Sequence, residues 1–288
     1  MITKPMLAGK VEDFSKIQFP VLATPKLDGI RCLKINGKAV SRSFKPIANV
    51  FVREWIEKHI PNGMDGELMV EGVPFSEIAG FIGSHYGKPN FRFYCFDYVT
   101  QGLRQPYSSR AANLADFPTI DRLVKVLPVT IRNEKELNAF EEKCLADGYE
   151  GVMIRTPNSP YKCGRSTERE GYLLKIKRMD DSEAVILECI EGQSNRNEAT
   201  EDNFGRTKRS SHKANKFPKN TLGAFRVRDL KTGVEFNISG FTAAFAASVW
   251  ANQKKYVGTI VKYKYQAVGS KTAPRFPKFV GFREKWDM

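Results

Sequence analysis

The sequence predicts an α+β fold in two parts, a larger one of antiparallel sheets flanked by helices and a smaller one built as an all-β barrel. Up to about residue 178, short apolar runs with the character of strands alternate with patterns typical of amphipathic helices. After Arg178 the chain changes to short strands with a single helical stretch. We therefore expect one domain at residues 1–178 and a second at 179–288.

Composition limits the function and the compartment. A net charge of +14 and a pI near 9.5 favour a polyanionic partner, with nucleic acid first. No apolar run approaches membrane-spanning length, and the N-terminus lacks a secretory pattern, so we expect a soluble intracellular protein without membrane contact. Five scattered cysteines and three distant histidines indicate reduced thiols and no zinc site, so a metal would be a hard cation on oxygen ligands.

The first elements form a strand, a hairpin and a helix. Residues 21–24 read as a buried strand that delivers Lys26 to its end. Residues 30–35 and 38–42 flank Asn36-Gly37, the strongest short signal for a tight hairpin, which returns Arg42 towards Lys26. Asn49 is a suitable N-cap for a helix that ends near His59, before Pro61.

The next elements place acids on strands. Residues 64–70 predict a strand that carries Glu67, and residues 91–99 predict an aromatic strand that carries Phe96. Residues 108–117 read as a helix, 124–129 as extended, and Asn133 caps an amphipathic helix that ends before Gly148. Residues 150–155 form another strand that begins with an acid, Glu150.

Residues 173–177 predict a strand whose two faces differ. Leu174 and Ile176 would point into the core, so Lys175 and Lys177 would share the opposite face. Two ammonium groups on one face repel each other, which favours a shared anion. A solvated edge strand is the alternative.

The second part predicts a small Greek-key barrel of the oligonucleotide-binding (OB) kind, from strands at residues 184–190, 223–229, 234–239 and 259–265 and a helix from Thr242. A polar insert at about 195–220 has no acid between Asp202 and Asp229. Its composition predicts flexibility in the free protein and ordering on phosphates, and an idle loop is the alternative. The insert's cations are Arg206, Lys208, Arg209, Lys213, Lys216 and Lys219.

Together these residues predict a phosphoryl-transfer site. Lys26 would be the nucleophile, because an amine can attack phosphorus and split one transfer into two steps. Alternatives remain for single residues: Asp28 precedes glycine and could form only a turn, and Phe96 could be core. The other members are Arg42, Glu67, Phe96, Glu150, Lys175 and Lys177.

The order of these motifs resembles the covalent nucleotidyltransferases, which comprise DNA ligases, RNA ligases and mRNA capping enzymes. Three further matches, at residues 161–167, 202–205 and 274–277, resemble the minimal ATP-dependent DNA ligases and extend the resemblance over nearly the whole chain. The motif matches are Lys26-Leu27-Asp28-Gly29, Ser41-Arg42, Asp65-Gly66-Glu67-Leu68, Tyr94-Cys95-Phe96-Asp97, Glu150-Gly151-Val152-Met153 and Leu174-Lys175-Ile176-Lys177.

The resemblance implies an ATP-dependent DNA ligase that uses Mg²⁺, for which Mn²⁺ can substitute. Lys26 would accept AMP from ATP, pass it to the 5′-phosphate of a nick, and the 3′-hydroxyl would then displace it. The partner would be nicked duplex DNA, encircled by a monomer. The insert would be a β-hairpin that acts as a latch, and its cations that contact DNA would be Arg206, Lys208, Arg209, Lys213 and Lys216.

The resemblance also implies roles for single residues. Arg42 and Glu67 would contact the ribose, and Phe96 would stack on adenine. Glu67 and Glu150 would serve the metal, and Lys175 and Lys177 would hold the α-phosphate. The residues implied for nick chemistry are Asp28, Ser41, Arg42 and Arg165, and those implied for pyrophosphate are Arg275 and Asp287.

Three alternative functions remain. An RNA ligase or a capping guanylyltransferase shares the lysine chemistry, with an RNA nick or GTP as substrate. A non-catalytic nucleic-acid-binding module would have no need of the complete set around Lys26. The absence of a zinc-type cysteine cluster disfavours the NAD-dependent ligases.

Overall fold

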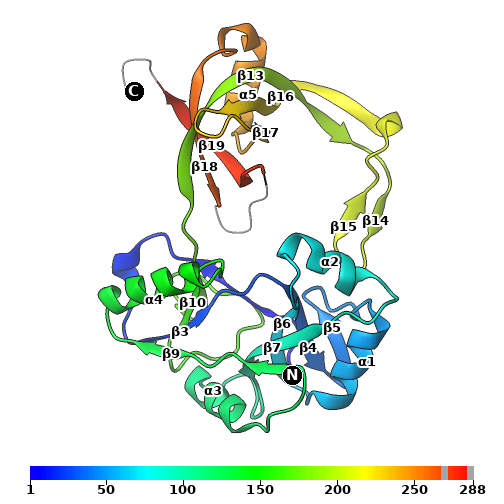
Figure 1. Cartoon of the computed structure of the whole chain (residues 1–288), viewed down its shortest axis with the longest axis vertical. Coiled ribbons are helices and arrows are strands. Elements are labelled where there is room, and N and C mark those ends of the chain that lie inside the picture. The colour runs from blue at the N-terminus through cyan, green and yellow to red at the C-terminus, as the bar shows by residue number, and fades with distance from the viewer. Residues whose placement is uncertain (267–271, 284–288) are drawn as a thin grey trace. The chain divides into compact units, whose positions relative to one another are not determined.

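The computed structural model describes residues 1–266 and 272–283. These residues form five α-helices and nineteen β-strands (Figure 1). Contacts divide the chain into two compact units. The first is Met1–Lys177 with Glu201–Arg206, and the second is Arg178–Thr200 with Thr207–Met288.

One sheet of the first unit carries the predicted nucleophile. Helix α4 (Glu134–Ala146) packs against this sheet, and its N-cap is Asn133, as predicted. Apolar residues of the strands and of α4, among them Ala23, Leu137 and Ile154, form one core. In spatial order the strands are β2 (Gly9–Lys10), β12 (Leu174–Ile176), β10 (Val152–Arg155), β3 (Val21–Pro25) and β9 (Val129–Ile131).

The second sheet of this unit packs with helices α1 (Val50–His59), α2 (Phe75–Gly83) and α3 (Tyr107–Asp116). The predicted cap Asn49 accepts a hydrogen bond from the Val52 amide, and Asn36 and Gly37 both have positive φ, as a tight hairpin requires. In order the strands are β5 (Lys38–Ser41), β4 (Ile30–Ile35), β6 (Met64–Val70), β7 (Phe91–Tyr98) and β8 (Leu123–Lys125).

The structure corrects the prediction of one extended stretch at 124–129. That stretch contributes to two strands, β8 beside β7 in one sheet and β9 beside β3 in the other. Pro128 lies between them and has no amide to continue a ladder. A separate two-stranded sheet pairs β1 (Met6–Leu7) with β11 (Gly164–Arg165) in parallel.

The second unit contains the predicted strands and helix α5 (Ala243–Ala251) around a core that includes Phe225 and Tyr263. One parallel bridge, Ser239–Lys278, connects the end strands, so the barrel is not closed by a continuous ladder. In order the strands are β17 (Glu235–Ile238), β16 (Lys216–Asp229), β13 (Asp180–Asn195), β18 (Ile260–Gln266) and β19 (Arg275–Arg283).

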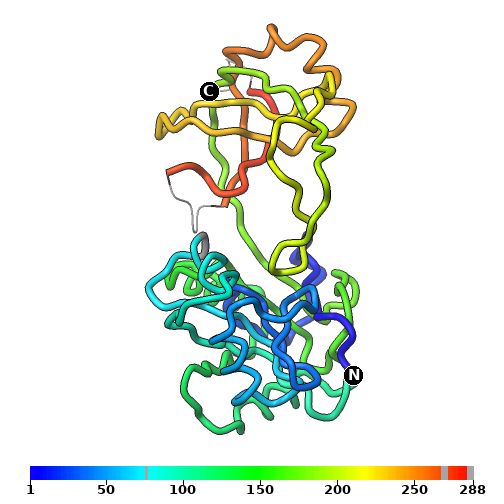
Figure 2. Tube along the Cα trace, turned by 90° about the vertical axis from the view of Figure 1, so that its right-hand side faces the viewer, coloured from blue at the N-terminus to red at the C-terminus, as the bar shows by residue number. Residues whose placement is uncertain are grey.

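The insert has the β-hairpin form that the family resemblance implies. Strands β13 and β16 remain paired out to Asn195–Lys216 and run side by side in Figure 2. Beyond them β14 (Ala199–Glu201) pairs with β15 (Thr207–Arg209). A polar composition is compatible with this pairing, because the backbones of both arms satisfy each other's hydrogen bonds without a buried face. Among the described residues, no helix has the length and apolar character needed to span a membrane.

Candidate active site

Lys26 follows strand β3 and is fixed by the neighbouring strand. Its amide donates to the Gly151 carbonyl at 2.8 Å, and its carbonyl accepts from the Glu150 amide at 3.1 Å. This exchange places the two side chains together, and the Lys26 ammonium donates to the Glu150 carboxylate. A Cβ at Gly151 would lie 2.3 Å from the Ile176 carbonyl oxygen, so only glycine allows strands β10 and β12 to approach this closely.

The loop after Lys26 lies against strand β6. A Cβ at Gly29 would lie 2.5 Å from the Leu68 carbonyl oxygen and 2.8 Å from the Glu67 side chain. The glycine of the Lys26-Leu27-Asp28-Gly29 motif therefore allows the nucleophile's loop to contact the strand that carries Glu67. A turn-forming role alone does not explain this glycine.

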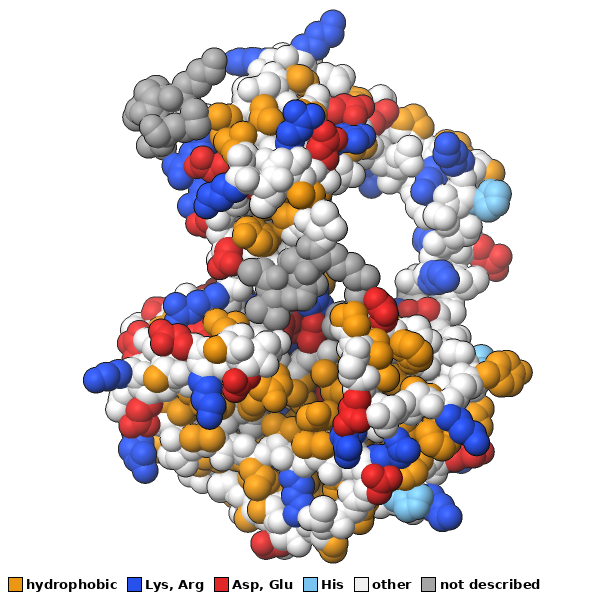
Figure 3. Space-filling view, in the orientation of Figure 1, with side chains coloured by type: hydrophobic (Ala, Val, Ile, Leu, Met, Phe, Trp, Pro, Cys, Tyr) orange, Lys and Arg blue, Asp and Glu red, His pale blue; other side chains and the backbone are white. Residues whose placement is uncertain are grey.

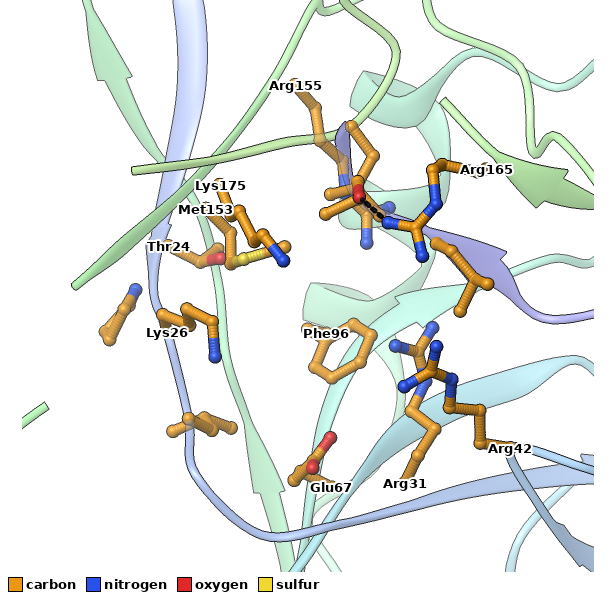
Figure 4. A pocket seen from close by; sticks show the side chains of 15 residues that line it. Thr24, Lys26, Arg31, Arg42, Glu67, Phe96, Met153, Arg155, Arg165 and Lys175 are labelled. Atoms are coloured by element: carbon orange, nitrogen blue, oxygen red, sulfur yellow. Dashed lines mark hydrogen bonds between the residues drawn. The ribbon is translucent and has the colours of Figure 1, made fainter. Parts of the chain in front are cut away.

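The Lys26 loop, strand β6 and strand β10 contribute side chains to the lining of a cavity of about 240 Å³ in the first unit (Figure 4). In this view the Lys26 and Lys175 amines lie on one side of the Phe96 ring, and the Arg31 and Arg42 guanidinium groups lie on the other. The cavity thus gathers residues from separate motifs. The predicted residues that line it are Lys26, Arg42, Glu67, Phe96, Arg165 and Lys175.

Several lining residues were not predicted to serve the site, among them Thr24, Arg31, Met153 and Arg155. For Met153 and Arg155, the alternation of side chains along strand β10 indicates that they face the cavity. Val152 and Ile154 are buried in the core, so Met153 and Arg155 face the other way, into the cavity. The prediction used the acid at the start of this strand and did not extend the alternation.

The lining of the cavity suits an anion. It carries six cations and only one acid, Glu67. Burial and the neighbouring Arg165 lower the pKa of Arg42, and burial and Lys26 lower the pKa of Lys175. Burial is the larger cause of both shifts, and the crowding of like charges adds to it; a bound polyphosphate would relieve that repulsion. The six cations are Lys26, Arg31, Arg42, Arg155, Arg165 and Lys175.

Glu150 pairs with two of the predicted lysines. Its carboxylate is 5% exposed and accepts hydrogen bonds from both Lys26 and Lys177. Burial disfavours the charged form, but the two ammonium groups outweigh it, so the pKa of Glu150 lies below its ordinary value. The acid is therefore ionised at neutral pH and holds the nucleophile's amine in place.

Glu67 behaves in the opposite way. Burial raises the pKa of Glu67 to about 7, although Arg31 and Lys26 oppose this rise. A carboxyl that is only partly ionised at neutral pH can accept or donate a hydrogen bond. The two predicted acids thus differ in charge because their partners differ: Glu150 is paired directly with ammonium groups.

Replacing Glu67 with glutamine is expected to stabilise the protein at pH 8. Because the pKa rises from 4.5 to about 7 on folding, the folded state binds more protons and stability falls as pH increases between these values. The shift corresponds to about 3 kcal/mol, which we reduce to ~1–2 kcal/mol for residual solvent access. The variant should melt roughly 3–6 °C above the parent at pH 8, with little gap at pH 4.5. Equal melting temperatures at pH 8 would contradict this.

A buried ionic cluster lies behind Phe96. Asp97 is fully buried and pairs with Arg110 and Arg155. The Arg155 guanidinium lies 4.2 Å from the centre of the Tyr107 ring, and that of Arg31 lies 4.8 Å from the centre of the Phe96 ring. The Phe96 ring, which packs against Arg31, lines the cavity, and its stacking on adenine stays a prediction.

Other predicted residues that the structure describes lie outside the cavity lining. Ser41 is buried and donates to the Phe204 carbonyl oxygen in the tip of the insert. Arg275 belongs to β19 in the second unit, and Asp287 lies outside the described residues. Asp28 lies in the loop after the nucleophile.

The two carboxylates fit a magnesium site that is completed by substrate. Among residues 1–266 and 272–283 no group of three His, Cys, Asp or Glu side chains could hold a metal. Mg²⁺ in nucleotide sites needs only one or two carboxylates, because water and phosphate oxygens supply the rest. Glu67 and Glu150 both interact with the Lys26 amine, so they are the residues that would hold Mg²⁺ beside the nucleophile.

Two family models match the chain. The family described as "ATP dependent DNA ligase domain" matches residues 5–177, and the one described as "DNA ligase OB-like domain" matches residues 216–283. The first match alone covers more than half of the chain. Both agree with the predicted fold class.

Two individual ligases are similar over most of the chain, and a third over less than half of it. The crystal structure of Chlorella virus DNA ligase-adenylate is 35% identical, with 98% of this chain and 100% of that one aligned at a TM-score of 0.59. The DNA ligase of Haemophilus influenzae is 24% identical over 90% of this chain and 85% of that protein. The match to the DNA ligase of African swine fever virus, at 27% identity, covers 45% of this chain and spans only 32% of the viral protein.

The fold and the family models define a nucleotidyltransferase of the DNA ligase class with an OB-like domain. The chain belongs to the ATP-dependent DNA ligase family. The family resemblance predicted from the sequence is confirmed.

Proposed function

We propose that this chain seals nicks in duplex DNA with ATP, through an AMP carried on Lys26. The observation that carries the proposal is the cavity itself, where the Lys26 amine, the Phe96 ring and an excess of cations face one another. An aromatic ring suits a base, and the cations suit the phosphates. The proposed domains are a nucleotidyltransferase domain at 1–178 and an OB-fold domain at 179–288.

In the first step the Lys26 nitrogen attacks the α-phosphorus of ATP. A bond from nitrogen to phosphorus forms, the bond to the β-phosphate oxygen breaks, and pyrophosphate leaves. The amine must lose a proton, and Glu150 already accepts a hydrogen bond from it. Lys175 and Lys177 would stabilise the charge that develops on the α-phosphate. Bound Mg²⁺ would supply further neutralisation of phosphate charge.

In the second step an oxygen of the 5′-phosphate attacks the AMP phosphorus and Lys26 leaves as the amine. In the third step the 3′-hydroxyl attacks the 5′-phosphate and AMP leaves. Arg42 and Arg165 would hold the 5′-phosphate; both line the cavity, and Arg165 is anchored by a 2.7 Å hydrogen bond to the Ala8 carbonyl. Asp28 and Ser41 would assist this step, and Arg275 and Asp287 would act on pyrophosphate.

The insert supports DNA as the partner. Figure 3 shows several Lys and Arg side chains along it. Lys208, Lys213 and Lys219 are exposed, so they are available to phosphates. We infer that the chain works as a monomer that encircles DNA, in a reducing intracellular compartment that suits its five free cysteines.

A sealing assay tests this function. A duplex with one labelled 5′-phosphate nick is incubated with ATP and Mg²⁺, and the joined strand should appear on a denaturing gel. A nick with a 5′-hydroxyl is the control, because it has no phosphate to receive AMP. Sealing of RNA nicks alone, or use of GTP alone, would instead support an RNA ligase or a capping enzyme, and binding without any transfer would support a non-catalytic module.

A further inference from the structure

Tyr161 is a buried residue that does not line the cavity but hydrogen-bonds to two segments that position cavity residues. Tyr161 is 2% exposed, and its hydroxyl donates to Asp65 Oδ2 at 2.6 Å. The same hydroxyl oxygen accepts the Met6 amide at 3.1 Å. Burial raises the pKa of Tyr161 well above its ordinary value, so the hydroxyl keeps its proton and remains a donor.

The Met6 contact anchors the segment that supports Arg165. Met6 begins strand β1, in which Leu7 pairs with Arg165 of β11. Leu7 and Ala8 line the cavity, and the Ala8 carbonyl accepts the Arg165 guanidinium. Since Met6 is completely buried and its amide is held by the phenol, Tyr161 fixes one end of this segment.

The Asp65 contact anchors a second cation. Asp65 is fully buried and takes the Arg31 guanidinium through both carboxylate oxygens, with Arg31 Nη2 2.7 Å from Oδ2. Arg31 Nη2 also donates to the Met6 carbonyl at 3.3 Å. Tyr161, Asp65, Arg31 and Met6 therefore form one closed hydrogen-bonded network, in which the phenol joins the carboxylate to the backbone of β1.

We propose that Tyr161 is a positioning residue for recognition of the 5′-phosphate of the nick. It touches no substrate; it sets the position of Arg165 through strand β1 and that of Arg31 through Asp65. The inference rests on the proposed function, in which Arg165 and Arg42 receive that phosphate. Phenylalanine at this position would leave the Met6 amide without its acceptor and Asp65 without one of its donors, while the ring still fills the core.

The test is the preference for a 5′-phosphate over a 5′-hydroxyl at the nick, measured as the ratio of the two dissociation constants for Tyr161→Phe. We expect the ratio to fall about ten-fold, as when one hydrogen bond to a charged group is lost, with little change in binding of the 5′-hydroxyl nick. The matched control is Tyr263→Phe, because Tyr263 is also buried and donates to a buried aspartate, Asp229, in the second unit. Its ratio should equal that of the unmodified chain.

A second variant and a second readout guard against loss of folding. Asp65→Asn weakens the same network and should lower the same ratio. In the unmodified chain, hydrogen exchange of residues 6–8 should slow when a 5′-phosphate nick binds and not when a 5′-hydroxyl nick binds. An unchanged ratio in a folded Tyr161→Phe variant, or unchanged exchange, would overturn the inference. If the unmodified chain shows no preference for the 5′-phosphate, the proposed function itself fails.

Discussion

Glu150→Gln is expected to lower the rate of AMP transfer to Lys26 by about 10²–10⁴-fold, the range for a positioned acid–base group. The glutamine keeps the shape of the side chain and removes its charge. It would therefore leave the ammonium groups of Lys26 and Lys177 without their common partner, in a cavity that already has an excess of cations. The amine would lose both its proton acceptor and its fixed position.

The rate is measured in a single turnover with ATP and Mg²⁺, by the appearance of labelled AMP on the protein. The matched control is Glu141→Gln, since Glu141 is likewise buried and lies on α4, outside the cavity. That variant should transfer AMP at the parent rate. A Glu150→Gln protein that folds and transfers AMP within three-fold of the parent rate would contradict the role assigned to Glu150.

Neutralising three lysines of the insert is expected to weaken nick binding by ~10–10²-fold at low salt. Lys208, Lys213 and Lys219 are exposed on the insert. If each contacts one phosphate, replacing all three with glutamine should reduce the slope of log affinity against log salt by roughly 2–3. AMP transfer from ATP to Lys26 should remain unchanged, because none of the three lines the cavity.

The control carries the same change in net charge elsewhere on the second unit. Lys231, Lys254 and Lys255 are also exposed and lie outside the insert. If their replacement reduces affinity and salt dependence as much as replacement of the insert lysines, the effect belongs to overall charge. In that case the insert has no special part in DNA binding.

Local chemistry made most of the first unit predictable. Asn49 and Asn133 are N-caps, and Asn36-Gly37 forms the hairpin turn, because each of these residues determines its own neighbourhood. Helix α2 was not predicted. Its two glycines, Gly80 and Gly83, are poor helix formers, and the packing of Ile78 and Ile82 in the core stabilises the helix instead.

The site was partly predictable for the same reason. Lys26, Glu67 and Lys175 belong to short motifs that can be read along the chain, and the cavity brings them together. Strand alternation indicates which way Arg155 faces, but the buried partners of Arg155 and Tyr161 could not be assigned in this way. The positions of both residues depend on contacts with Asp97 and Asp65, which are 58 and 96 residues away in sequence. Such pairings are set by the packing of the two sheets.

The most direct measurement of the central claim is the intact mass of the protein after incubation with ATP and Mg²⁺, under denaturing conditions, with Lys26→Ala in parallel. Pyrophosphate treatment beforehand removes any AMP already bound. We expect one covalent AMP on the unmodified chain, located by peptide mapping on Lys26, and none on the variant. A folded, pyrophosphate-treated protein that forms no adduct, or an adduct that persists in Lys26→Ala, would contradict the assignment of Lys26 as the nucleophile.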